Sequence, residues 1–116
     1  MANIYKNAKK DLTTSNVTIL YTAPVNARAI IKSMLVCNDQ GSASTISITL
    51  FPGAPAAGGG IKLFNTTAVG ANTTIQLITE PLIVQENEVL EVVAADANRL
   101  HITASMLELN RDDQNG

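Results

Sequence analysis

The chain has 116 residues and a formal net charge of −2, with no Trp and only two Phe and two Tyr. This length accommodates a single domain with one core, which must be built from Ile, Leu, Val and Ala. The sequence contains no basic block, which argues against a nucleic-acid partner, and no apolar run approaches the roughly 20 residues of a membrane helix.

The first segment, residues 1–13, is rich in Asn and Lys and has few side chains suited to a core. We predict an extended N-terminal arm outside the main domain, and no signal peptide, because no apolar stretch follows the charges. Such an arm could dock on a partner, with Tyr5 as the best anchor because its ring buries a large area and keeps a polar tip. The alternative is a solubilising tail. The candidate partner-binding residues are Ile4, Tyr5, Lys6, Lys9, Lys10 and Leu12.

Residues 17–22 alternate and predict a strand, and a longer strand follows with Ala29, Ile31, Ser33, Leu35 and Cys37 on one face. The opposite face of this longer strand is too apolar to be left in open solvent. We therefore predict that this face is covered, either by part of the same chain or by a neighbouring subunit. In the second case it is a subunit interface, most simply in a closed homotrimer. The candidate interface residues are Ile30, Lys32, Met34 and Val36.

Residues 45–50 alternate without error, which predicts a half-buried strand with Thr45, Ser47 and Thr49 facing away from the core. The polar residues 38–42 before it are typical of a hairpin loop, as are residues 96–99 later in the chain. The predicted core residues are Ile31, Leu35, Ile46, Ile48, Leu50, Leu90 and Val92.

Further strands are predicted at residues 61–64, 73–79, 88–94 and 100–109, and residues 51–60 read as a long loop. No stretch sustains a helical period. About eight strands with short turns indicate an all-β fold, a single antiparallel β-sandwich of jelly-roll type with an extended N-terminal arm. The predicted organisation is an arm over residues 1–13, a β-sandwich domain over residues 14–110, and a polar C-terminal tail over residues 111–116.

The sequence offers little material for catalysis, which needs a base, an orienting group and an activated nucleophile or metal. His101 is the single histidine and Cys37 the single cysteine, so a zinc site with the usual ligands is not expected. Gly58-Gly59-Gly60 precedes a strand and lacks the ending of a phosphate loop. The acidic group at Glu80, Glu86, Glu88 and Glu91 lacks the spacing of a calcium loop. We predict no catalytic residues, no metal, no cofactor and no enzyme activity.

Several strings resemble small β-sandwich virion proteins of tailed bacteriophages, of the type found in phages of cyanobacteria and other marine bacteria. They are ANIYKNAK at residues 2–9, DLTT at 11–14, LYTAP at 20–24, AIIKS at 29–33, NDQGSA at 38–43 and AADANRLH at 94–101. The resemblance spans nearly the whole chain but includes no active-site signature.

The resemblance implies a phage virion structural protein, most simply a capsid decoration or cement protein that binds the outer shell and stabilises neighbouring capsomers. One alternative is a neck, tail or fibre-attachment component, and a remote one is a carbohydrate-binding module, disfavoured because sugar-binding faces commonly carry aromatic rings. The expected partners are the major capsid protein or neck and tail proteins, and further copies of this chain, with no nucleic acid and no membrane. The expected location is the virion, assembled in the host cytoplasm.

Overall fold

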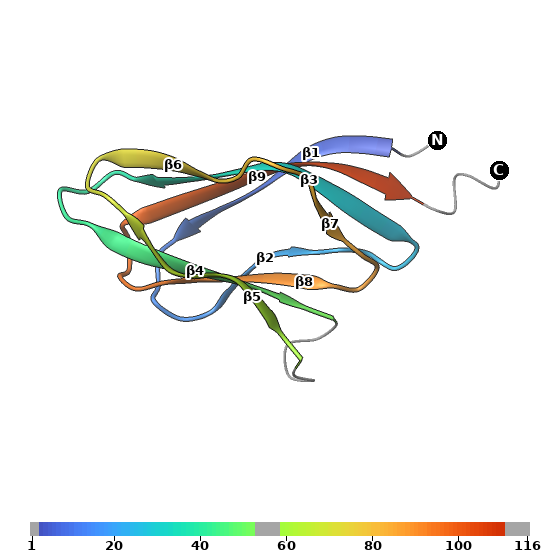
Figure 1. Ribbon diagram of the computed structural model, residues 1–116, viewed down its shortest axis with the longest axis horizontal. Helices are drawn as coiled ribbons and strands as arrows, with labels where there is room; N and C mark the ends of the chain where they lie inside the picture. The colour runs from blue at the N-terminus through green and yellow to red at the C-terminus, as the bar shows by residue number, and fades with distance from the viewer. Residues whose placement is uncertain (1–2, 53–58, 111–116) are drawn as a thin grey trace.

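The computed structural model describes residues 3–52 and 59–110, which form nine strands and no helix (Figure 1). The strands are β1 (Asn3–Leu12), β2 (Thr18–Thr22), β3 (Ala27–Asn38), β4 (Ser44–Phe51), β5 (Ile61–Val69), β6 (Thr73–Ile78), β7 (Leu82–Val84), β8 (Val89–Ala94) and β9 (Leu100–Asn110). No helix long and apolar enough to cross a membrane occurs in these two ranges.

The strands build two antiparallel sheets that pack face to face (Figure 1). The five-stranded sheet has the order β1-β9-β3-β6, with β7 also paired to β3, and the four-stranded sheet has the order β2-β8-β4-β5. Because β6 and β7 pair with successive parts of β3, they act as one interrupted strand. Most connections carry the chain from one sheet to the other, as in a jelly roll, so the predicted all-β jelly-roll sandwich is confirmed.

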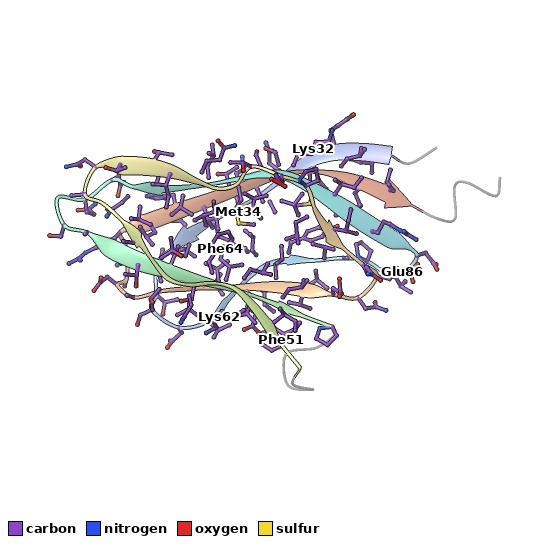
Figure 2. All side chains as sticks on the ribbon, in the orientation of Figure 1. Lys32, Met34, Phe51, Lys62, Phe64 and Glu86 are labelled. Atoms are coloured by element: carbon purple, nitrogen blue, oxygen red, sulfur yellow. The ribbon has the colours of Figure 1, made fainter. Side chains whose placement is uncertain are left out.

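The long strand β3 contains a bulge that the sequence pattern conceals. Its register against β9 shifts between Ile31 and Ser33, which leaves Lys32 as an additional residue. A bulge of this kind inverts the alternation beyond it, so Ile31 is buried before the bulge and Met34 and Val36 are buried after it. Figure 2 shows the result, with Lys32 on the outer side of the sheet and Met34 between the sheets.

The core confirms most of the predicted set. Ile31, Ile46, Ile48, Leu90 and Val92 are buried, and Leu50 packs against them while partly exposed. The prediction for Leu35 is wrong: this side chain is 42% exposed, because the bulge turns it to the outer face. Thr45, Ser47 and Thr49 alternate with the buried residues of β4 and are only half-buried.

The connections differ from the two predicted hairpins. Residues 39–43 join β3 to β4, and residues 95–99 join β8 to β9, so each connection passes from one sheet to the other. Buried Asn38 organises the first connection, since its side-chain amide donates to the carbonyls of Ser42 and Val69 and its Oδ1 accepts from the backbone N–H of Gln40. The connection that joins paired strands of one sheet is the long one between β4 and β5.

The N-terminal segment also differs from its prediction. Residues 3–12 are not an arm outside the sandwich but the edge strand β1, which pairs with β9 along its whole length. The physical reason is that backbone pairing needs no apolar side chain, so a polar sequence can still form a sheet edge. The predicted polar tail, residues 111–116, lies outside the described residues.

Replacing Ile48 by alanine should lower the free energy of unfolding by about 2–5 kcal/mol, because the fully buried side chain would leave a cavity between the sheets. Urea unfolding monitored by circular dichroism measures this change. The matched control is Ile61→Ala, at a position that is 61% exposed, where we expect a change of no more than about 0.5 kcal/mol. Equal losses in both variants would contradict the core described here.

Candidate interaction surface

An apolar row crosses the outer face of the five-stranded sheet. Tyr5 lies opposite Leu107, Leu107 lies opposite Ile30, and Ile30 lies opposite Ile83, so four adjacent strands contribute one side chain each. Tyr5 is 74% exposed and Ile83 is 44% exposed, while Leu107 and Ile30 are half-buried. We call these four residues the outer row. Contiguous apolar side chains on an outer face are typical of protein contact surfaces.

The β3 bulge shapes one end of the outer row. It places the Lys32 Nζ atom 5.8 Å from the centroid of the Tyr5 ring, which is a cation–π distance. Beside the ring, the Ser105 hydroxyl donates to Asn7 Oδ1 at 2.8 Å. A shallow hollow of about 200 Å³ lies among these residues. The row therefore ends in an exposed ring flanked by a cation and by polar groups, as protein contact surfaces often do.

A buried polar network holds β1 and β9 against the other sheet. The Tyr21 hydroxyl on β2 donates to Glu108 Oε2 on β9 at 2.6 Å, and the Lys6 ammonium on β1 lies 3.5 Å from the same oxygen. The Lys6 Nζ atom also lies 5.8 Å from the centroid of the Tyr21 ring. Burial, followed by the hydrogen bond and negative charge of Glu108, raises the pKa of Tyr21 well above its ordinary range.

A second polar cluster connects the opposite end of β1 to its neighbours. His101 Nε2 lies 3.1 Å from Asp39 Oδ2, and His101 Nδ1 lies 3.4 Å from Asp11 Oδ1. Hydrogen bonds from the Gln40 side chain and then from His101 hold the pKa of Asp39 below its ordinary value. The cluster joins β1, β9 and the β3–β4 connection. Within residues 3–52 and 59–110, no group of three or more His, Cys, Asp or Glu has the arrangement of a metal site.

An apolar groove of about 350 Å³ opens between the edges of the two sheets, where β5 faces β6 and β7. Its walls include Phe64, Leu77, Pro81 and Leu82. Figure 2 shows Phe64 directed into the space between the sheets. The groove is thus the open margin of the core rather than a separate chamber.

The predicted partner-binding residues all lie on β1, but they do not form one surface. Tyr5 and Lys9 lie on the outer face, whereas Ile4, Lys6, Lys10 and Leu12 lie on the face turned toward the other sheet. Leu12 is only 1% exposed, so its assignment as a partner anchor is wrong and it belongs to the core. The remaining assignments stay predictions.

The predicted subunit interface is divided by the bulge. Ile30 and Lys32 face outward, but Met34 and Val36 are buried in the core, so their assignment to an interface is wrong. The face that suggested a trimer therefore does not exist as one surface. Leu107 and Ile83, which complete the outer row, were not among the interface residues predicted from the sequence. Within residues 100–109 the side chains alternate between the two faces, so Leu107 lies on the face opposite to that of the buried Met106. This alternation was the signal that could have identified Leu107 as an outward-facing residue.

The strand order and the packing of the two sheets define this protein as a jelly-roll β-sandwich. No protein-family model and no curated protein matches its sequence. Among solved structures it is similar to a chain of the Bacillus endospore appendages, which form a family of disulfide-linked pili, with TM-score 0.55 and 12% identity over 93% of this chain and 88% of that chain.

A second similar structure is that of infectious bursal disease virus Gt strain, with TM-score 0.42 and 10% identity over 95% of this chain and 31% of that chain. This second likeness is too distant to support a conclusion. The likeness to the appendage chain shows a shared fold, and fold alone does not assign a function.

Tyr21→Phe should lower the free energy of unfolding by about 1.5–3 kcal/mol at neutral pH, because a hydrogen bond to a buried carboxylate is lost. The folded protein holds the phenol proton more tightly than the unfolded chain does. The contribution of Tyr21 is therefore complete below about pH 10 and is lost as the pH rises through its raised folded-state pKa. Wild-type stability should fall more steeply above about pH 10 than that of Tyr21→Phe, as measured by urea midpoints.

The control for this experiment is Tyr5→Phe, which makes the same chemical change at an exposed ring. Its stability should follow the wild-type curve with pH. Parallel pH profiles for the wild type and Tyr21→Phe would contradict the role given to the Tyr21–Glu108 pair.

Proposed function

We propose that this protein is a structural component of a phage virion rather than an enzyme, and that it serves as a decoration protein that binds the outer shell and stabilises neighbouring capsomers. The expected partner is the major capsid protein, and the expected location is the assembled virion. The single observation that carries the proposal is the outer row, an apolar stripe across four strands of a stable sheet.

The outer row suits a shallow contact with a broad protein surface. Its side chains project from paired strands, so little backbone conformational entropy is lost when a partner covers them. An exposed Tyr at one end supplies the large ring and polar tip that dominate many contact surfaces. Lys32 and Lys9 lie on the same outer face and would speed encounter with an acidic partner.

Two further considerations support this proposal. The sequence resembles small β-sandwich virion proteins in strings that include residues 2–9, which contain Tyr5 of the outer row. In addition, the similar appendage chain is part of disulfide-linked pili, so a sandwich of this kind is used in one extended protein assembly. A position in the neck, tail or fibre attachment would use the same outer row with a different partner protein.

The outer row can be tested without disturbing the fold. Truncating the N-terminus is unsuitable because it would remove the strand β1 from the sheet. We expect the double variant Tyr5→Ser and Ile83→Ser to bind particles of the parent phage, assembled without this protein, at least about tenfold more weakly than the wild type. Co-sedimentation with such particles measures the binding.

Leu35→Ser is the matched control, because Leu35 lies on the same outer face outside the row and is exposed to nearly the same degree as Ile83. Its binding should equal that of the wild type. Wild-type binding by the double variant would refute the role of the outer row, and absence of wild-type binding would refute the virion proposal. Many copies over the shell in a cryo-electron microscopy reconstruction would support decoration, and a few copies at one vertex would favour the neck or tail.

A further inference from the structure

Three of the four sheet edges are shaped in ways that discourage pairing with another strand. The edge strand β2 has only five residues and a register shift after Ile19. The edge strand β5 has two register shifts against β4 and a left-handed residue, Thr66, with φ 47°. The third edge is divided between β6 and β7, with Pro81 in the gap. Short, bulged or proline-containing edges are the usual protection against edge-to-edge association.

The edge formed by β1 has none of these features. It runs for ten residues, Asn3–Leu12, and pairs with β9 without a register shift. In an antiparallel pair, alternate residues direct their backbone N–H and C=O groups away from the paired neighbour. These groups on β1 form a long, regular template for one more strand. Within the described part of the chain, the charged side chains of β1 itself are what opposes such pairing.

We propose that the free edge of β1 pairs antiparallel with β1 of a second copy of this chain, about a two-fold axis that passes through Asn7. A two-fold axis that relates two antiparallel edge strands stands perpendicular to the sheet, so it keeps both outer faces on the same side. Only side chains of the same face can then lie opposite one another, which restricts the register to steps of two residues.

Among the registers that pair seven or more residues of β1, the lysines select one. A centre at Lys6 places Lys6 opposite itself, a centre at Ala8 places Lys6 opposite Lys10, and a centre at Lys9 places Lys9 opposite itself. A centre at Asn7 avoids all of these like-charge pairs over residues 3–11.

The register centred on Asn7 also creates one favourable pair and leaves Lys6 opposite a small, neutral residue. Lys9 of the second copy lies opposite the exposed ring of Tyr5, and Ala8 of the second copy lies opposite Lys6. The two five-stranded sheets thereby become one continuous sheet, with both outer rows on the same side. This dimer does not depend on the proposed virion role, since it follows from the edge of β1 alone.

Disulfide trapping tests the register directly. In a Cys37→Ala background, which removes the native thiol, Asn7→Cys should form a crosslinked dimer under mild oxidation. Directly opposed residues in an antiparallel pair have Cα atoms about 4.5–5.5 Å apart, within disulfide range. The control Lys9→Cys should not crosslink, because the two Lys9 positions are offset by four residues, or about 13 Å along the strands.

The oligomeric state tests the dimer without a crosslink. We expect light scattering after size exclusion to give a dimer mass for the wild type. Asn7→Asp should weaken dimerisation by about tenfold or more, because it places two carboxylates opposite one another. The introduced carboxylate can still accept a hydrogen bond from the Ser105 hydroxyl, so the free energy of unfolding of the monomer should stay the same.

The possible results separate clearly. A dimer that Asn7→Asp weakens, together with crosslinking at position 7 and not at position 9, supports the proposal. A wild-type protein that remains monomeric at concentrations up to about 1 mM, the range of weak association, overturns the proposal. A trimer overturns it as well. Crosslinking at position 9 in preference to position 7 overturns the register centred on Asn7.

Discussion

The bulge at Lys32 is the local feature on which the rest of the five-stranded sheet depends. The strand β3 pairs with β9 on one side and with β6 and β7 on the other, so its register sets theirs. The last residue of β6, Ile78, lies opposite Met34, and the first residue of β7, Leu82, lies opposite Ile31. The bulge thus lies opposite the break in the edge formed by β6 and β7. It also turns Met34 into the core and brings Lys32 over the ring of Tyr5.

Two polar clusters hold the edge strand β1, whose own side chains contribute little to the core. Near its N-terminal end, Lys6 lies beside the Tyr21–Glu108 pair, which joins the two sheets. Near its C-terminal end, Asp11 contacts His101, and Leu12 enters the core. A strand fixed at both ends can keep a long backbone edge open without fraying. This gives the edge the regular geometry that pairing with another strand requires.

The outer surface of the five-stranded sheet thus offers two distinct sites for contact. The outer row is a side-chain surface, made of apolar groups from four strands. The edge of β1 is a backbone surface, whose specificity comes from the placement of its lysines. The proposed contact with a shell and the proposed pairing with a second copy would therefore use different surfaces. Tyr5 belongs to both, because it lies at the end of the outer row and on the edge strand.

The sequence by itself determined the all-β class, most of the strands, and the buried side of β4, because an alternation such as that of residues 45–50 reports burial directly. It also identified Tyr5 and Ile30 as surface candidates. Only the tertiary structure decided that residues 3–12 form a sheet edge, because backbone pairing leaves no apolar signature in the side chains. The bulge at Lys32 was hidden for a related reason. Both faces of β3 carry apolar residues, so a shift of alternation by one residue leaves the pattern equally plausible, and only the register against β9 shows which face enters the core.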